Sequence, residues 1–572
     1  MTITHAPIAV AFFAALLVPR LAVAAEYYVS TDGDDDNPGT ETEPFATVGR
    51  GQQAAAPGDT VWVRGGTYSF SSGTVGVAFT KAGQADNLIQ YFAYPDEVVV
   101  FDLSAINPSG RVTGFDVQTD YIHLRGMEIT GVPQFQSGED SWGLRIRGSN
   151  NVIEQMNVHH NEAPGIFITS GSNNLILNCD SHHNYDVLED GGSGDGFGCH
   201  STGAGNVLSG CRGWANSDDG YDFINAPGAC TVEHSWAWRN GWVPDTNSAA
   251  GNGAGFKAGG FGLDTGSFPS TIPVHVVRHC VAWNNRSQGF YANHHPGRID
   301  FLNNTAYDNS RNYDLLDDVG EGTHFLRNNV AFGSGGDLSN STSDDAEYNS
   351  WNGGVSLSDA DFESLSDAGA DGPRQADGGL PRLPFLHLAE GSDLIDAGID
   401  VGLAYAGAAP DLGAFETGEA AADATGGAGG TSTTDSTTST TLSGSGGSSV
   451  TSGLAATSDA ATSGGADVAS SVTGTSSAAA AVTGALPTST SATANALTTA
   501  TTGAGSGAAN GAGGASAAGS GSDGLETTAT DGSPGAQSAE RGCACGLPGA
   551  ERRELELARV ICGLAGLALG IT

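Results

Sequence analysis

The stretch NLILNCDSHHN, residues 174–184, has six further copies in this 572-residue chain. The aligned copies begin at residues 151, 206, 230, 275, 299 and 324. Most intervals between them are 23 to 25 residues, and two are longer. Each copy alternates apolar and polar residues as a short strand does. A strand repeat of this period predicts an all-β fold, a parallel β-helix of about ten coils.

Two positions of the repeat keep one residue type along the chain. Six copies end in asparagine, namely Asn161, Asn184, Asn216, Asn240, Asn285 and Asn309. Two places earlier every copy has a ring, namely His159, His182, Trp214, Trp238, Trp283, Tyr307 and Phe332. Equivalent residues of successive coils stack about 4.8 Å apart. Amides can then hydrogen-bond along the axis and rings can stack, so we interpret both columns, with His159 and His182, as scaffold rather than ligands.

The ends of the repeat region and its cysteines fit the same fold. Residues 43–68 predict a short amphipathic helix that caps the first coil, followed by the first strand. Residues 393–416 predict the last coil. Cys179, Cys211 and Cys280 fall in one column of small buried side chains. No disulfide is required, although the first two of these cysteines can lie on adjacent coils.

A second short strand follows the asparagine turn in each coil, with a glycine at a fixed position. The copies read PGIFI (164–168), DGFGC (195–199), DGYDF (219–223), AGFKA (254–258) and QGFYA (288–292). Successive strand side chains alternate faces, so the residue two places after the glycine should point outward. That outward column is Phe167, Gly198, Asp222, Lys257 and Tyr291, then Asp314 in the next copy. Asp222 and Lys257 are therefore expected to be neighbours one coil apart.

Four carboxylates converge beside this column. Asp195 and Asp219 precede the glycines of adjacent copies, Asp218 adjoins them, and Asp222 points outward. One Asp-Gly pair is an ordinary turn. Four aspartates on about two coils repel one another unless a cation lies among them, and an all-oxygen, flexible set suits Ca²⁺ best. The sequence therefore predicts a calcium site formed by these four residues.

Lys257 is one of only two lysines in the chain and lies in GNGAGFKAGG, residues 251–260. A solvated surface lysine is the simplest alternative. Against it stand the scarcity of lysine and the small uncharged neighbours. A nearby divalent cation disfavours the protonated amine, which lowers its pKa toward the range of a general base. We therefore expect Lys257 to be catalytic.

Charge and composition limit the partners and divide the chain. The formal charge of −42 argues against nucleic acid or an anionic membrane as a partner. An acidic polymer could bind only if a cation bridged its negative charges and those of the protein. Residues 1–25 are expected to be a secretory signal peptide and 26–417 the β-helix domain. Residues 418–541, rich in Ala, Gly, Ser and Thr, predict a disordered linker.

The last segment, 542–572, holds Cys543, Cys545 and a short apolar end. It resembles the C-terminal sorting segments of some Gram-negative surface proteins. Its apolar part is too short to span a bilayer alone. We expect a secreted protein whose catalytic domain does not enter the membrane, and surface anchoring through one of these cysteines stays open.

The motifs GSGDGFGCH, NSDDGYDF, SWAWRNG, GNGAGFKAGG and NNTAYDN resemble the family 9 polysaccharide lyases over roughly residues 120–320. The resemblance implies a right-handed parallel β-helix that acts as a monomeric pectate lyase on polygalacturonate by β-elimination. It also implies that Lys257 is the base and that the catalytic Ca²⁺ is bound by Asp195, Asp218, Asp219 and Asp222. Where members of the family tend to have asparagines, this chain has His294 and His295. Subsite preference is therefore open, with Arg286 and Asn293 as further candidates.

Three other functions remain open at this point. A noncatalytic β-helix adhesin or glycan-binding stalk would also suit the long linker. A lyase acting on rhamnogalacturonan, alginate or another uronate polymer would share the same chemistry. A glycoside hydrolase needs an acid together with a base or nucleophile at a defined separation, which a lysine beside a metal cluster serves poorly.

Overall fold

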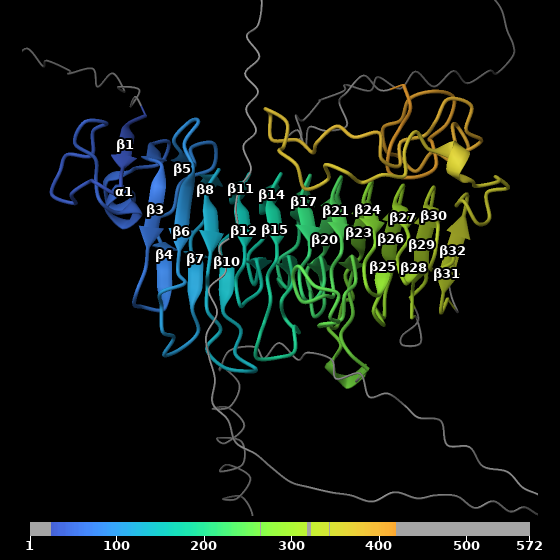
Figure 1. The fold of residues 1–572 in the computed structure, drawn as a ribbon, viewed down its shortest axis with the longest axis horizontal. Coiled ribbons are helices and arrows are strands. Elements are labelled where there is room, and N and C mark those ends of the chain that lie inside the picture. Colours follow the sequence, from blue (N-terminus) through green and yellow to red (C-terminus); the bar gives the residue numbers. More distant parts are fainter. Residues whose placement is uncertain (1–23, 264, 317–321, 342–343, 419–572) are drawn as a thin grey trace, which may run out of the picture. The chain divides into compact units, whose positions relative to one another are not determined.

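The chain winds into three parallel sheets, so the predicted parallel β-helix is confirmed (Figure 1). The computed structural model describes residues 24–263, 265–316, 322–341 and 344–418. Each full coil contributes one strand to each sheet, and each strand pairs in parallel with its equivalent one coil on. The sheets have twelve, ten and ten strands, which agrees with the expected number of coils.

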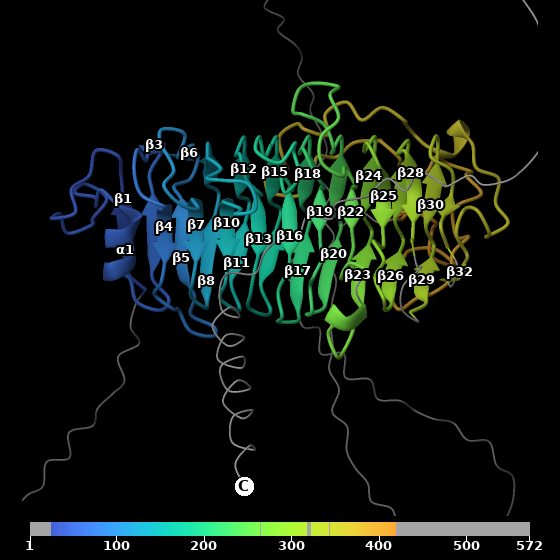
Figure 2. The same cartoon turned by 90° about the horizontal axis from the view of Figure 1, so that it is seen from below.

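We call the three sheets A, B and C in the order in which a coil visits them. Sheet A comprises β1 (Glu26–Val29), β2 (Thr60–Val63), β5 (Ile89–Ala93), β8 (Ile122–Arg125), β11 (Val152–Glu154), β14 (Leu175–Leu177), β17 (Asn206–Ser209), β20 (Cys230–Glu233), β23 (His275–Arg278), β26 (Ile299–Leu302), β29 (His324–Arg327) and β32 (Asp344–Glu347). Sheet B comprises β3 (Gly66–Ser69), β6 (Val99–Asp102), β9 (Glu128–Thr130), β12 (Asn157–His159), β15 (Asp180–His182), β18 (Arg212–Trp214), β21 (Trp236–Trp238), β24 (Val281–Trp283), β27 (Thr305–Tyr307) and β30 (Val330–Phe332). Sheet C, seen in Figure 2, comprises β4 (Val75–Phe79), β7 (Thr113–Val117), β10 (Trp142–Ile146), β13 (Ile166–Ile168), β16 (Phe197–Cys199), β19 (Tyr221–Asp222), β22 (Phe256–Lys257), β25 (Gln288–Tyr291), β28 (Arg311–Asp314) and β31 (Leu338–Ser339).

Each aligned repeat segment forms two strands rather than one. The segment 174–184, for example, contributes β14 to sheet A and β15 to sheet B. Between them Asn178 has a φ of 53°, and His234 and Asn303 hold similar left-handed values at the same place in their coils. This left-handed residue turns the chain from one sheet to the next, which strand alternation alone does not show.

Both predicted columns are confirmed as scaffold. Along the asparagine column the amide Nδ2 of Asn184 donates to Asn216 Oδ1 at 3.0 Å, and Asn216 Nδ2 donates to Asn240 Oδ1 at 3.2 Å. In the ring column His159 and His182 stack with centroids 5.0 Å apart and planes 6° apart. These contacts satisfy buried polar groups at the turn that leads into sheet C, and they fix the register of neighbouring coils.

The interior beneath sheet C is an aromatic stack. The rings of Phe197, Tyr221, Phe256, Phe290 and Tyr313 follow one another with centroids 4.5 to 5.1 Å apart. Each ring is fully buried and belongs to the residue that follows the strand's glycine or its equivalent. Alternation then places the next residue of each strand on the outer face of sheet C.

The N-terminal cap is confirmed. Helix α1 (Val48–Ala54) begins at Thr47, whose side chain accepts a hydrogen bond from the backbone N–H of Arg50. Its buried face packs on β1, β2 and β4. Elsewhere in the described ranges the helical segments are two single 3₁₀ turns, η1 (Thr265–Ser267) and η2 (Asp359–Asp361). The helix covers the apolar end of the first coil, as a solenoid requires.

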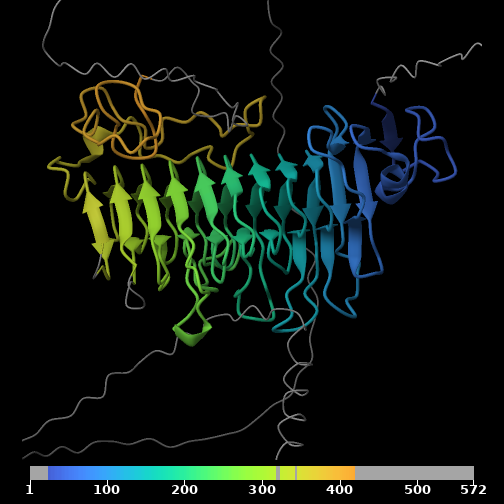
Figure 3. The ribbon, with the colours of Figure 1, turned by 180° about the vertical axis from the view of Figure 1, so that it is seen from behind.

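The prediction that residues 393–416 form the last coil is wrong. These residues form no strand and belong to a C-terminal strap, residues 350–418, that lies along the outer face of sheet B (Figures 1 and 3). Leu394 and Leu412 are buried in one cluster with Trp283 of the ring column. The sequence pattern showed that this segment is apolar, but it did not show whether the apolar residues pack inside or outside the solenoid.

The cysteines are partly as expected. Cys179, Cys211 and Cys280 are buried and free, and the first two lie on adjacent coils. Cys199 of β16 and Cys230 of β20 form a disulfide that the sequence did not suggest. They lie 31 residues apart and on different sheets, so no repeat column brings them together.

The expectations for residues 1–23, and for the linker and sorting segment beyond residue 418, lie outside the described residues. Within the described part of the chain, no helix has the length and apolarity to cross a membrane.

Candidate active site

The expected outward column of sheet C is present. Gly198 of β16 pairs with Asp222 of β19, and Asp222 pairs with Lys257 at the end of β22. Phe167 precedes them in the column and Tyr291 follows, both as predicted. Lys257 and the four aspartates are therefore close together on neighbouring coils, as the sequence predicted.

Three of the aspartates form the closest set. Carboxylate oxygens of Asp195, Asp218 and Asp219 lie within 4.8 Å of one another, and all three residues are buried. Asp222 falls outside this triad and instead faces Lys257, whose Nζ lies 3.3 Å from Asp222 Oδ2. The geometry brings all four residues together, and the role of Asp222 as a metal ligand stays a prediction.

Backbone N–H groups of neighbouring turns hold the triad in place. Asp218 Oδ2 accepts from Ser193 N at 3.0 Å, and its Oδ1 accepts from Asn252 N. Asp219 Oδ1 accepts from Ala254 N at 2.6 Å. These donors fix the orientation of the carboxylates, and each aspartate keeps a second oxygen or lone pair for another partner.

The glycine-rich stretch before Lys257 is explained by this packing. Gly251 has a φ of 46°, and a Cβ there would lie 2.5 Å from Ser217 O and 2.6 Å from Asp218 Oδ1. A larger residue would therefore push the chain away from the triad. The small residue allows Asn252 to donate to Asp218.

Burial and mutual repulsion raise the pKa values of the triad. Burial is the largest cause for Asp195, followed by the charges of the other three aspartates, and its pKa is raised well above the usual range. Burial together with its acidic neighbours raises the pKa of Asp219 to about 8, despite the opposing effect of Lys257. Without a cation the site therefore disfavours full ionisation.

The pKa of Lys257 is raised in the protein without a cation, whereas the sequence analysis expected a nearby cation to lower it. Burial alone would lower the pKa of its amine, but the charges of Asp222 and Asp219 outweigh burial and hold the pKa well above its usual value. The expected lowering therefore depends on a cation that neutralises the carboxylates. The protein alone keeps the amine protonated.

The donor set fits a hard divalent cation. Asp219 Oδ2 is buried and accepts no hydrogen bond from a described residue, and Lys257 Nζ is its ion-pair partner at 3.3 Å. The Lys257 ammonium compensates the charge of this atom, and a divalent cation bound by the triad could do the same. Carboxylate oxygens in a multidentate, buried set are the ligands that Ca²⁺ prefers. Asp195, Asp218 and Asp219 could therefore hold the ion.

Sequence reasoning gave no role to His200, the last letter of the GSGDGFGCH motif. Its Nε2 is buried, has no hydrogen-bond partner among the described residues and lies 4.0 Å from Asp222 Oδ2. The ring contacts Phe167 edge-on, with centroids 5.1 Å apart. The signal was present, since His200 follows Gly198 by two residues and so lies on the same outward face.

The four subsite candidates have mainly structural contacts. His295 is 1% exposed, and its ring contacts Gly260 N and Pro273 O. Asn293 Nδ2 donates to Gly259 O at 2.9 Å. Arg286 Nη2 donates to Asn252 O at 2.8 Å and also to Gly251 O, so it supports the glycine-rich stretch. His294 has contacts of its own and no shown role in the site.

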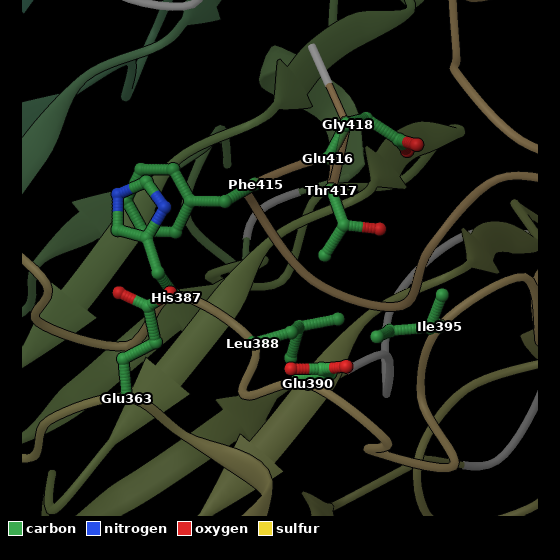
Figure 4. Close-up of a pocket in the computed structure, with 9 residues that line it drawn as sticks. All are labelled: Glu363, His387, Leu388, Glu390, Ile395, Phe415, Glu416, Thr417 and Gly418. Atoms are coloured by element: carbon green, nitrogen blue, oxygen red, sulfur yellow. The ribbon is translucent and has the colours of Figure 1, made fainter. Parts of the chain in front are cut away.

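A cavity of about 420 Å³ lies within the C-terminal strap (Figure 4). Glu363, Glu390 and Glu416 line it, and the ring of His387 stacks on Phe415 with centroids 4.0 Å apart. Every residue that lines the cavity belongs to the strap, so it shares none with the acidic triad. Its lining contains no lysine, and we assign it no part in the chemistry.

Comparison with known proteins agrees with this geometry. Residues 27–331 match the family described as "Pel9A-like, right handed beta helix region". Pectate lyase L of Dickeya chrysanthemi is 36% identical over 402 residues, which cover 68% of this chain and 90% of that protein. The crystal structure of pectate lyase Pel9A gives a TM-score of 0.61 at 35% identity, over 69% of this chain and 97% of the other. A solved rhamnogalacturonan lyase gives 0.59 at 35% identity, over 64% and 97%.

Fold and site together define a polysaccharide lyase built on a parallel β-helix. The match extends beyond residues 120–320, where the motifs first indicated it, to both sides of that region. The chain belongs to the Pel9A-like right-handed β-helix family, the family 9 pectate lyases.

Proposed function

We propose that this protein is a Ca²⁺-dependent pectate lyase that cleaves polygalacturonate by β-elimination, with Lys257 as the general base. The observation that carries the proposal is the position of Lys257 Nζ, 3.3 Å from Asp219 Oδ2 and 3.3 Å from Asp222 Oδ2. One carboxylate belongs to the triad that can hold the cation. The base therefore lies next to the place where the substrate carboxylate would be held.

In this proposal Lys257 removes the proton from C5 of a uronate unit. The electron pair of that C–H bond forms a C4–C5 double bond, and the C4–O bond to the next sugar breaks. The leaving oxygen takes a proton from water. When bound by Asp195, Asp218, Asp219 and Asp222, Ca²⁺ supplies positive charge that attracts the substrate carboxylate and stabilises the negative charge that develops beside C5.

The residues that follow Lys257 are small and buried, and they pack closely against the next coil. A Cβ on Gly259 would lie 2.6 Å from His295 Nδ1, and a Cβ on Gly260 would lie 2.2 Å from Asn293 O. Lys257 itself is only 6% exposed. A base that is held by carboxylates and shielded from water keeps its position when substrate arrives.

A lyase on a different uronate polymer is the second candidate. It is supported by the solved rhamnogalacturonan lyase, which matches this chain with the same identity as Pel9A. The same acidic triad and lysine would serve both substrates. The alternative of a noncatalytic glycan-binding stalk would use the β-helix alone and gives no reason for a buried lysine among carboxylates.

We also propose that the protein acts outside the cell, because its expected substrate is an extracellular polymer and its first 25 residues have the pattern of a signal peptide.

The test is an assay of unsaturated product by ultraviolet absorbance on polygalacturonate, rhamnogalacturonan and alginate, with Ca²⁺ and with chelator. We expect product from polygalacturonate that chelator abolishes and Ca²⁺ restores. Product from rhamnogalacturonan alone would favour the second candidate. Binding of all three polymers with no unsaturated product from any of them would overturn the lyase proposal.

A further inference from the structure

A second cavity lies on the outer side of sheet B, where the ring column meets the strap. Its volume is about 200 Å³, smaller than the range of about 300–1,000 Å³ typical of sites for drug-sized ligands. Trp214 and Trp238 of the ring column, Trp242 of the following loop and Asp371 of the strap line it. None of these residues belongs to the acidic triad. A cavity of this size suits one or two small rings.

The two column tryptophans have indole N–H groups without an acceptor. One coil further on, Trp283 Nε1 donates to Asp367 Oδ2 of the strap at 2.8 Å. Among the described residues, Trp214 and Trp238 have no such acceptor, although they are only 8% and 4% exposed and line the cavity. Neither indole nitrogen is among the fully buried polar atoms that lack a partner, so both N–H groups are open to water and can donate to a ligand with hydroxyl groups.

The wall of the cavity is preformed. Trp242 pairs with Ala249 in an antiparallel bridge, and Val243 N donates to Ser248 O at 2.9 Å. This hairpin carries the Trp242 ring, which is partly exposed. Binding therefore orders few new groups, which favours affinity for a small ligand.

The charges around the cavity select against an acid. Asp245 and Asp371 contribute two carboxylates, while Arg239 contributes one guanidinium. The Nε2 atom of His183 lies 3.4 Å from Asp245 Oδ1. Burial of His183 lowers the pKa of its imidazole, so the ring is neutral at neutral pH. Carboxylates accept hydrogen bonds from hydroxyl groups but repel a uronate.

We propose that this cavity binds a neutral sugar unit, a hexose or pentose of a polysaccharide, with Trp242 against the ring and Asp371 accepting from its hydroxyl groups. Aromatic rings together with a few convergent polar groups are the composition of a small-ligand site. The site is separate from the catalytic lysine and does not depend on the proposed lyase reaction.

The test measures binding of D-galactose, L-arabinose, L-rhamnose and digalacturonic acid to the whole protein by isothermal titration calorimetry. We expect at least one neutral sugar to bind with a dissociation constant of about 1 mM, as a small ligand allows. Trp242→Ala and Asp371→Ala should each weaken that binding about tenfold or more. The matched control is Trp62→Ala, at a tryptophan of β2 near the N-terminal end of sheet A and away from the cavity. This variant should leave binding unchanged.

Three results would overturn the proposal. They are binding of digalacturonic acid alone, no binding of any neutral sugar at tens of millimolar, or unchanged affinity in both cavity variants. Asp371→Ala should also keep its lyase activity on unbranched polygalacturonate, because Asp371 touches no residue of the acidic triad. Loss of that activity with intact sugar binding would likewise count against a separate site.

Discussion

Lys257 and Asp222 are in register on adjacent strands of sheet C, and the amine Nζ lies 3.3 Å from Asp222 Oδ2. A second carboxylate, that of Asp219, lies 3.3 Å from the same nitrogen. These two acids hold the amine in place and keep it protonated in the metal-free protein. In the proposed mechanism the protonation of Lys257 is therefore linked to the cation, because only neutralised carboxylates would release the amine from this pairing.

Replacing Lys257 with alanine should reduce kcat on polygalacturonate by about 10²- to 10⁴-fold, the range that a general base contributes. Calcium binding should remain, because the lysine is no ligand and its removal leaves the carboxylates in place. Initial rates of unsaturated product and calorimetric titration with Ca²⁺ measure the two effects. Lys81→Ala is the matched control, since Lys81 is the only other lysine and donates to Gln53 O at 3.0 Å far from the triad. An active Lys257→Ala enzyme would refute the assignment of the base.

Replacing Asp219 with asparagine should have opposite effects on stability and on metal affinity. The amide can still accept from Ala254 N and stays neutral without taking up a proton, so the free-energy cost of burying this side chain falls. We expect a higher Tm than the wild type in chelator, and calcium affinity lower by about 100-fold or more. Asp86→Asn, at an exposed residue with a φ of 64°, is the control. If Asp219→Asn lowered Tm in chelator and kept calcium affinity, the triad would be a structural cluster and not a metal site.

In the metal-free protein, Asp219 should contribute a loss of stability as pH rises from about 4 to about 8. Buried histidines such as His275 and His279, whose pKa values burial lowers to about 3, contribute a gain of stability up to about pH 6.5, so the test compares variants rather than the wild type alone. Asp219 has a folded pKa of about 8 against a usual value of 3.8, so across this interval the folded protein holds a proton that the unfolded chain has released. The pKa of Lys257 is also raised, from an already high usual value, so its contribution to stability stays constant until much higher pH. Calcium favours the ionised carboxylates and should raise Tm more at about pH 8 than at about pH 5.

Differential scanning calorimetry with chelator and with Ca²⁺, at both pH values, measures this dependence. In chelator, the Tm of Asp219→Asn should rise more with pH, or fall less, than the Tm of the wild type, because the amide does not titrate. The same pH dependence in both proteins would show that Asp219 is ionised without a cation.

The sequence was most informative where one residue type recurs on successive coils. Asn216 and Asn240 belong to such a column. Asp222 and Lys257 differ in type, but the aligned glycines of their repeats place them at one position, and parallel strands in register bring equivalent positions side by side. The triad could be located for the same reason. The orientation of the three carboxylates could not be predicted. It depends on the backbone N–H groups of Asn252 and Ala254, and a pattern of side chains carries no information about backbone donors.

Contacts between different sheets, or between the strap and sheet B, could not be predicted. Cys199 and Cys230 belong to sheets C and A and pair across the interior, so their spacing follows no period. Residues 393–416 are apolar in a pattern that fits an inner coil as well as an outer covering. The position of His200 on the outward face could be read from the sequence, but only the structure shows that its buried Nε2 has no hydrogen-bond partner among the described residues.

The strap is fixed to sheet B by a buried ion pair, which predicts a strong dependence of stability on Arg374. Arg374 Nη2 lies 2.7 Å from Asp180 Oδ1, and Arg212 Nη2 lies 2.6 Å from Asp180 Oδ2. Burial alone would raise the pKa of Asp180, but the charges of both arginines lower it to about 2. Because the folded pKa is depressed, this stabilisation is complete above the usual value of 3.8 and is lost as pH falls toward about 2.

Arg374→Met should therefore destabilise the protein by about 3–5 kcal/mol at neutral pH, as expected when one partner of a buried pair is removed. The matched control is Arg298→Met, which removes the partner of Asp300. The side chain of Arg298 is 47% exposed, whereas that of Arg374 is 11% exposed. An exposed pair contributes about 0–1 kcal/mol, so its loss should change stability little. Denaturant unfolding measures both variants, and hydrogen exchange should show faster exchange in the strap of Arg374→Met. Equal stability losses in the two variants would mean that Arg374 does not hold the strap on sheet B.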